Sequence, residues 1–234
     1  VTIEPKKEKK VDDDKTDYYF INSIGSDEVG TGDYFGPIIV CASYVNRKDI
    51  SFLEELGVRD SKKLTDDKIL KIAPEIIKRI PHQEEIISNT EYNNMQDNGY
   101  NMNKIKAIYH NKALLGLMKK DNFVYDMVVV DQFTPERNYY NYLKSEPNVF
   151  RKIKFTTKAE DKCLSVACSS IISRYLFLKE IEKIGNSLGS FIPKGASTLV
   201  DDYGKKIVQN FGKEKLRSIA KLNFKNTEKI LNEN

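Results

Sequence analysis

The sequence predicts an α/β fold in which helices flank a mixed central β-sheet. Segments typical of strands come early in the chain, and helices alternate with strands later. The run "MVVV" over 127–130 shows no alternation with polar residues, which indicates a strand buried on both faces. In "CLSVACSSIISRYLFL", over 163–178, apolar residues recur at spacings of three and four, which predicts a helix with one apolar face.

The other elements follow from the same patterns. Each predicted strand is an apolar stretch next to turn residues, and each predicted helix has apolar residues at helical spacing. Thr65 is the expected N-cap of one helix, and Pro74 is expected to interrupt or restart that helix. The predicted strands are 18–28, 37–45, 82–88, 125–133 and 151–155, and the predicted helices are 65–80, 101–120, 163–178, 198–211 and 213–220.

The composition suits one folded domain of a soluble protein, with 234 residues of which 40% are hydrophobic. Residues 1–16 hold almost no large apolar side chains and are expected to form a disordered tail or linker. The domain is expected over 17–234, with C-terminal helices from about 198. The first residue is Val rather than Met, as in a fragment of a longer protein.

The same composition excludes several classes of protein. No apolar run reaches the roughly 20 residues that span a bilayer, and the N-terminus does not resemble a signal peptide, so no membrane partner is expected. Three cysteines without a CxxC pair suit a reducing cytoplasm. His82 and His110 are the only histidines, which argues against zinc sites and histidine catalysis, and we expect both at the surface or satisfied in the core.

The basic residues are unevenly distributed along the chain. The net charge is +4, but residues 205–234 hold eight Lys or Arg against three Glu, so this segment carries +5 and the remainder −1. A basic segment beside an acidic body favours contact with phosphates, and a solvated helix face is the alternative.

The segment "GSDEVGTGDYFGP", over 25–37, places Asp27 and Glu28 at the end of a predicted strand. Asp131 ends the buried run at 127–130 in the same way. A buried strand that ends in a carboxylate needs a partner for that charge. If the two strands are neighbours, Asp27 and Asp131 meet at one edge of the sheet, where Mg²⁺ is a suitable counter-charge. Glu28 is expected on the opposite face of its strand unless the strand ends there.

A third acidic position comes from the helix predicted at 163–178. Glu160 precedes three of its apolar residues by four, seven and eleven positions, so it extends the apolar stripe into an expected first turn. Asp161 lies one position round, and the spacing favours Glu160 only modestly. The glycines of 30–36 follow GxGxxxG, which supports neither a dinucleotide site nor a P-loop and leaves close backbone approach to a ligand.

Seven segments in order resemble type 2 ribonucleases H, specifically the ribonuclease HIII subtype, over about residues 24–230. They are "GSDEVGTGDYFGP", "GVRDSKKLTD", "YNMNKIKAIYHNKALLGL", "VVVDQF", "TKAEDKCLSVACSSIISRY", "PKGAS" and "KLNFKNTEKI". The resemblance implies a ribonuclease H-like fold with a helical C-terminal extension. It also implies four acids, Asp27, Glu28, Asp131 and Glu160, with Asp161 as the alternative to the last.

The activity implied by this resemblance is cleavage of the RNA strand in RNA–DNA hybrids with two Mg²⁺ or Mn²⁺ ions, leaving 3′-hydroxyl and 5′-phosphate ends. The substrates would be RNA primers, R-loops or misincorporated ribonucleotides, and a cytoplasmic monomer is expected. The residues expected to contact the substrate are Gly30, Thr31, Gly32, Ser61, Lys62 and Arg174. Structural salt bridges are the alternative for Ser61, Lys62 and Arg174.

One departure from the family and three alternatives bear on that expectation. Ribonuclease HIII normally has an N-terminal substrate-binding domain, and the short segment before residue 18 is not one. Incision at single ribonucleotides in duplex DNA, as by ribonuclease HII, is the nearest alternative activity. A non-catalytic hybrid-binding module and a small magnesium phosphatase or nucleotide-binding enzyme are the alternatives from other classes.

Overall fold

The structure is a computed structural model that describes residues 18–232, so the tail predicted at 1–16 lies outside the described residues. Its centre is a five-stranded sheet with strand order β3-β2-β1-β4-β5. The strands are β1 (Ser23–Val29), β2 (Ile38–Val45), β3 (His82–Ile87), β4 (Met127–Asp131) and β5 (Lys154–Thr156). The first three strands pair antiparallel, while β4 runs parallel to β1 and β5 parallel to β4. The predicted mixed sheet is confirmed.

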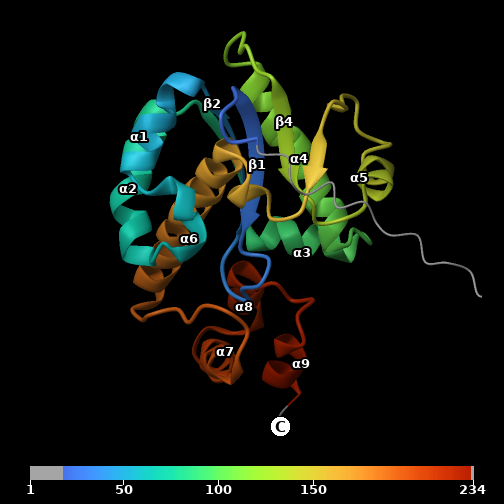
Figure 1. The fold of residues 1–234 in the computed structure, drawn as a ribbon. Coiled ribbons are helices and arrows are strands. Elements are labelled where there is room, and N and C mark those ends of the chain that lie inside the picture. Colours follow the sequence, from blue (N-terminus) through green and yellow to red (C-terminus); the bar gives the residue numbers. More distant parts are fainter. Residues whose placement is uncertain (1–17, 233–234) are drawn as a thin grey trace, which may run out of the picture.

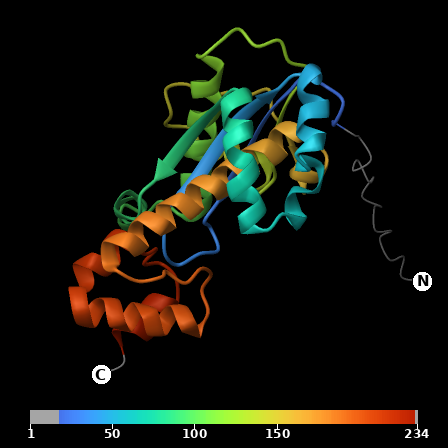
Figure 2. The same ribbon diagram turned by 90° about the vertical axis from the view of Figure 1, so that its left-hand side faces the viewer.

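Helices cover both faces of this sheet, as Figures 1 and 2 show. One face packs against α4 in a core that includes Ile24, Val40 and Val130, and the other packs against α2 and α6 in a core that includes Cys41. The first layer contains α3 (Asn89–Asp97), α4 (Met102–Met118) and α5 (Glu136–Tyr142), and the second contains α1 (Ile50–Glu55), α2 (Asp66–Arg79) and α6 (Leu164–Leu188). Because β1, β2 and β4 are covered on both sides, charges at their ends lie next to the core.

The C-terminal extension, residues 198–232, consists of α7 (Thr198–Phe211), α8 (Lys213–Ile219) and α9 (Asn226–Leu231). These helices lie beyond one end of the sheet, and in Figure 1 α7 and α9 lie below the loop that joins β1 to β2, with α8 at the level of that loop. They share a third hydrophobic core with Tyr34 and Phe35 of that loop and with Phe177 of α6. The helices predicted at 198–211 and 213–220 are confirmed, and their apolar faces are buried against the β1–β2 loop.

The structure corrects several element predictions. β5 starts at Lys154 rather than at Arg151, and α6 continues to Leu188 rather than ending at Leu178. β1 starts at Ser23 rather than at Tyr18. The α2 helix starts after the predicted cap Thr65 but continues through Pro74, which was expected to interrupt it. Pro74 lies on the exposed side of α2, so the carbonyl that loses its helical partner there faces water.

Three short 3₁₀ helices complete the described chain, namely η1 (Arg47–Asp49), η2 (Val58–Lys63) and η3 (Ala159–Asp161). Within residues 18–232, no helix combines the length and apolarity that a membrane crossing requires. Cys41, Cys163 and Cys168 are all free and buried.

Candidate active site

Asp27 of β1 and Asp131 of β4 occupy neighbouring positions in the sheet. The parallel pairing of β1 with β4 ends with Ser26 opposite Val130, so the next residue of each strand is an aspartate. Burial raises the pKa of Asp27 well above its usual value, and the charges of Glu28 and Asp131 raise it further. The pKa of Asp131 is also raised by burial, although its carboxylate accepts a 2.9 Å hydrogen bond from the Ala159 amide. The predicted meeting of the two carboxylates is confirmed, and their ionisation is unfavourable without a cation.

Glu28 faces the opposite side of β1 from Asp27, because the strand continues to Val29. Its Oε1 lies 2.5 Å from Nζ of Lys106, and its Oε2 lies 2.7 Å from Nε2 of His110. The other imidazole nitrogen of His110 lies 2.6 Å from the hydroxyl of Ser26. Burial opposes ionisation of Glu28, but the hydrogen bonds and charges of His110 and Lys106 outweigh it and lower its pKa to about 2.

Sequence reasoning missed this arrangement of Lys106 and His110. Both lie on α4 four residues apart, on the face that packs against the sheet. That spacing, next to two central acids, was the available signal. The expectation that His110 is a satisfied core residue is confirmed, because it is fully buried with both ring nitrogens engaged.

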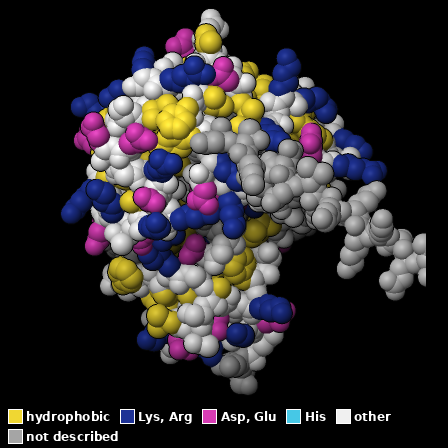
Figure 3. Space-filling view, in the orientation of Figure 1, with side chains coloured by type: hydrophobic (Ala, Val, Ile, Leu, Met, Phe, Trp, Pro, Cys, Tyr) yellow, Lys and Arg dark blue, Asp and Glu magenta, His cyan; other side chains and the backbone are white. Residues whose placement is uncertain are grey.

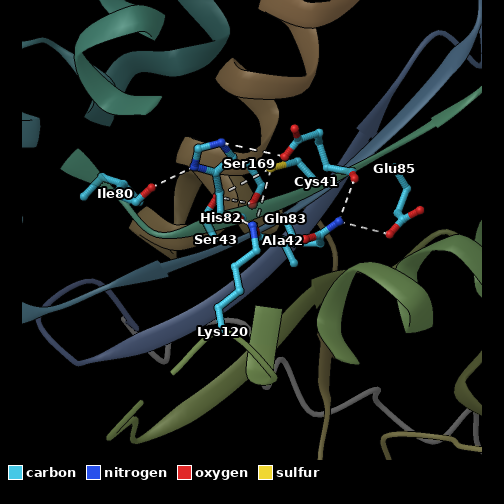
Figure 4. Close-up of polar contacts among 10 residues, drawn as sticks. Cys41, Ala42, Ser43, Ile80, His82, Gln83, Glu85, Lys120 and Ser169 are labelled. Atoms are coloured by element: carbon cyan, nitrogen blue, oxygen red, sulfur yellow. Dashed lines mark hydrogen bonds and ion pairs between the residues drawn. The ribbon is translucent and has the colours of Figure 1, made fainter. Parts of the chain in front are cut away.

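His82 lies apart from the acids, at the start of β3, which β2 separates from β1. Figure 4 shows its ring beside the carbonyl of Ile80, to which Nδ1 lies at 2.8 Å, and shows Lys120 directed at its backbone. In the same view, Ser169 of α6 hydrogen-bonds to Ser43 of β2 at 2.8 Å. These contacts join α6 to β2 and fix the start of β3, and they involve none of the four predicted acids.

Glu160 belongs to η3 and not to the first turn of α6, which corrects the helical prediction. Cys163 has an extended backbone, so α6 starts only at Leu164. Lys158 has a φ of 53°, the left-handed conformation, and reverses the chain directly before η3. This turn places Glu160 close enough to Asp131 for its charge to raise the Asp131 pKa.

Glu160 and Asp161 differ in what surrounds them. Lys62 contacts both, at 2.6 Å from Glu160 and 2.8 Å from Asp161. Only 13% of the Glu160 side chain is exposed, against 46% for Asp161. Oε2 of Glu160 is buried without a hydrogen-bond partner. The geometry therefore favours Glu160 as the acid that faces Asp131, and an unpartnered buried carboxylate oxygen is suited to a cation.

We call Asp27, Glu28, Asp131 and Glu160 the acidic edge. Among residues 18–232, no three His, Cys, Asp or Glu side chains are already gathered around one metal position. Two of the four acids are paired with lysines instead, Glu28 with Lys106 and Glu160 with Lys62. The donor set still fits a divalent cation, because all of its ligands are carboxylate oxygens. The charge of Asp131 disfavours ionisation of Asp27, and Oε2 of Glu160 has no hydrogen-bond partner, so a cation would stabilise both.

The glycine loop, residues 30–36, follows the acidic edge directly, and its glycines serve different purposes. Gly30 has a φ of 104°, and a Cβ there would lie 2.2 Å from the carbonyl oxygen of Pro37. Gly32 is exposed, and a Cβ there would meet nothing within 4 Å. Thr31 between them is partly exposed. The chain itself thus requires glycine at 30, whereas only an external ligand would require it at 32.

The other predicted substrate residues line one cavity of about 280 Å³, which also includes Ser170. The hydroxyl of Ser170 hydrogen-bonds to Asp27, so the cavity adjoins the acidic edge. Arg174 lies 2.8 Å from Asp66, and Lys62 is held by Glu160. The structure brings Ser61, Lys62 and Arg174 together, and it shows for the last two the salt bridges that were the alternative to substrate contact.

The basic C-terminal segment is only partly available for phosphates. Lys221 is completely buried, which contradicts its place among exposed basic residues. Arg217 pairs with Asp97 at 2.5 Å, and Lys229 lies 3.5 Å from Asp201. Figure 3 shows basic side chains spread over the body of the protein as well as over this end, so positive charge is not confined to the extension.

The chain is similar to known proteins over most of its length. Residues 24–227 match the family model described as Ribonuclease HII. The chain is 48% identical over 212 residues to Ribonuclease HIII of Phytoplasma mali, covering 89% of this chain and 72% of that one. It is 45% identical over 211 residues to Ribonuclease HIII of Lactococcus lactis, covering 90% and 72% of the two chains.

Solved structures agree. The crystal structure of Bst-RNase HIII in complex with Mn²⁺ superposes with a TM-score of 0.89 at 41% identity, over 92% of this chain and 70% of that one. The ribonuclease H2 of Pyrococcus horikoshii has a TM-score of 0.72 at 21% identity, over 89% and 96% of the two chains, and shows the shared fold.

Proposed function

Because the chain belongs to the ribonuclease HII family and is a ribonuclease H of the HIII type, we propose that it hydrolyses the RNA strand of RNA–DNA hybrids. The products would carry 3′-hydroxyl and 5′-phosphate ends. The observation that supports this most directly is the β1–β4 register, which sets Asp27 and Asp131 next to each other beside the glycine loop. Their raised pKa values mark a site that favours a cation.

The acidic edge would hold two Mg²⁺ or Mn²⁺ ions through Asp27, Glu28, Asp131 and Glu160. When bound, such ions lower the pKa of the attacking water and stabilise charge on the leaving oxygen. The chain orients the ligands by itself, since Ser170 bonds Asp27 and the Ala159 amide bonds Asp131. His110 and Lys106 favour the ionised form of Glu28, and Lys62 pairs with Glu160, so binding the ions requires these glutamates to share or leave their lysines.

Selection of RNA requires a contact with the 2′-hydroxyl, which distinguishes RNA from DNA. The open backbone at Gly32, with Thr31 and Gly30, would supply that contact next to the ions. Ser61, Lys62 and Arg174 would contact phosphate or sugar from the adjoining cavity. The enzyme would act as a cytoplasmic monomer on RNA primers, R-loops or misincorporated ribonucleotides.

Incision at single ribonucleotides in duplex DNA is the second candidate, because the matching family model is that of ribonuclease HII. We would incubate the protein with a continuous RNA–DNA hybrid and with a DNA duplex that holds one ribonucleotide, in Mg²⁺ and in Mn²⁺. Metal-dependent cleavage of the hybrid at the higher rate is the expected result. Faster incision at the single ribonucleotide would favour the second candidate, and cleavage of neither would indicate a non-catalytic binding module.

A further inference from the structure

A buried lysine connects the C-terminal extension to the glycine loop. Lys221 follows α8 and is 0% exposed. Its ammonium group donates hydrogen bonds to two backbone carbonyls of the loop, those of Asp33 at 2.7 Å and of Gly36. Within the described part of the chain it forms no ion pair. Burying an ammonium group without an ion pair costs free energy of folding, so packing alone does not explain a lysine at this position.

The backbone around Lys221 holds the same half of the loop. The Lys221 amide donates to the carbonyl of Tyr34 at 2.8 Å, and the Gly36 amide donates to the carbonyl of Ile219 at 2.9 Å. Phe35 forms an isolated antiparallel bridge with Ala220. The extension therefore pairs with residues 34–36 through backbone hydrogen bonds, as a neighbouring strand would, and reaches Asp33 through the Lys221 side chain.

Further contacts hold the loop from the other side. The Tyr34 amide donates to the carbonyl of Gly195 at 2.9 Å, and the Gly195 amide donates to Oδ1 of Asp33 at 2.7 Å. Asn89 donates to the carbonyl of Gly36 at 2.8 Å. Outside the helices and strands of residues 18–232, the backbone of residues 30–32 takes part in only one backbone–backbone hydrogen bond, a long one in which the Asp33 amide lies 3.4 Å from the Gly30 carbonyl. Residues 33–36 are fixed, whereas Thr31 and Gly32, next to the acidic edge, are partly or fully exposed and accessible to a ligand.

We propose that Lys221 is a positioning residue that fixes the glycine loop so that the backbone of Gly30–Gly32 meets the ribose of the substrate. The inference rests on the proposed function. Lysine suits this place because one flexible side chain carries three donors and can reach two carbonyls that converge on it. An apolar side chain of similar length would fill the volume but leave the Asp33 carbonyl without this donor.

The test compares Lys221→Met with Ile207→Ala. Ile207 is buried in the same hydrophobic core on α7 and forms no hydrogen bond with the loop. Both variants should lower the melting temperature. Only Lys221→Met should increase the rate of hydrogen exchange in the peptide that covers 30–36, by about tenfold, because residues 33–36 open more often without the Lys221 bonds. For the same reason, only Lys221→Met should lower kcat on an RNA–DNA hybrid, also by about tenfold. Equal effects of the two variants on exchange and kcat would overturn the proposal.

A second variant distinguishes failure of this proposal from failure of the proposed function. Lys221→Gln retains an amide donor, and its exchange and kcat should lie between those of wild type and Lys221→Met. If the Met variant does not fold, unchanged exchange and kcat in the Gln variant would overturn the proposal. Faster loop exchange with unchanged kcat would also overturn it, because Lys221 would then be structural only. If the wild type cleaves no hybrid, the proposed function fails, while the exchange measurement still shows whether Lys221 fixes the loop.

Discussion

The acidic edge and the glycine loop are neighbours in sequence but differ in how their polar groups are satisfied. At the acidic edge, Asp27 and Asp131 disfavour each other's charge, and one oxygen of Glu160 has no partner. In residues 33–36 of the loop, backbone groups are bonded to the C-terminal extension and to the segment around Gly195. The difference indicates that the first region is completed by an external cation, whereas folding alone completes the second.

The largest expected effect comes from removing one charge of the acidic edge. Asp27→Asn and Asp131→Asn should each lower the rate of hybrid cleavage by about 10³-fold or more, roughly 4 kcal/mol of transition-state stabilisation. Binding of the hybrid should change little. The rate is measured under single-turnover conditions, and hybrid affinity by fluorescence anisotropy.

Asp161→Asn is the matched control, because Asp161 is an acid next to Glu160 that contacts the same lysine but is more exposed. We expect this variant to keep cleavage within about threefold of wild type, since exposed ion pairs contribute little. Loss of activity in Asp161→Asn with activity kept in Glu160→Gln would reassign the fourth acid.

The two glycines of the loop give the second test. Gly30→Ala should destabilise the fold by about 3 kcal/mol, because it combines a positive φ with a backbone clash. Gly32→Ala should change stability by less than about 0.5 kcal/mol and still reduce hybrid cleavage about tenfold, because the new methyl group lies where the substrate approaches. Chemical denaturation and initial rates measure both. Full activity in Gly32→Ala would remove this position from substrate recognition.

The third test concerns stability without metal. Because the Asp27 pKa is raised in the folded state, its ionisation destabilises the protein as the pH rises through that pKa. Asp27→Asn removes this cost and should raise the melting temperature of the metal-free protein at pH 7 by about 2–4 °C, about 1 kcal/mol for a chain of this size. Mn²⁺ should stabilise the wild type more than the variant. A lower melting temperature for metal-free Asp27→Asn would show that the carboxylates are not in electrostatic conflict.

The last test concerns the pH dependence contributed by Lys221. Burial lowers the pKa of Lys221 from 10.5 to about 7, against the opposing charge of Asp33. Between these values the unfolded chain binds a proton that the folded chain has released, so this group makes the free energy of unfolding rise from pH 7 to 10.5. Below pH 7 its contribution is constant. The melting temperature of wild type minus that of Lys221→Met should therefore increase over this range, and an equal slope for both proteins would contradict the shift.

Prediction from the sequence succeeded for elements whose hydrophobic pattern extends over many consecutive residues. The run at 127–130 and the stripe on α6 established a buried strand and a helix, and Thr65 capped α2 as expected, its hydroxyl accepting from the Lys68 amide at 3.3 Å. The short helices α1, α3, α5 and α9 were not predicted, since six to nine residues give little periodicity. The helical position of Glu160 was wrong because an extended residue at 163 separates η3 from α6.

The sequence by itself determined which acids end the central strands and which family the chain resembles. Both follow from the order of residues within short segments, which does not depend on contacts between distant parts of the chain. Only the tertiary structure decided the partners of those acids. Lys106, Lys62 and Lys221 are all lysines of a basic chain, yet one holds Glu28, one bridges Glu160 and Asp161, and one bonds only to backbone carbonyls. Their roles depend on contacts across 78 to 188 residues of sequence, which local patterns do not encode.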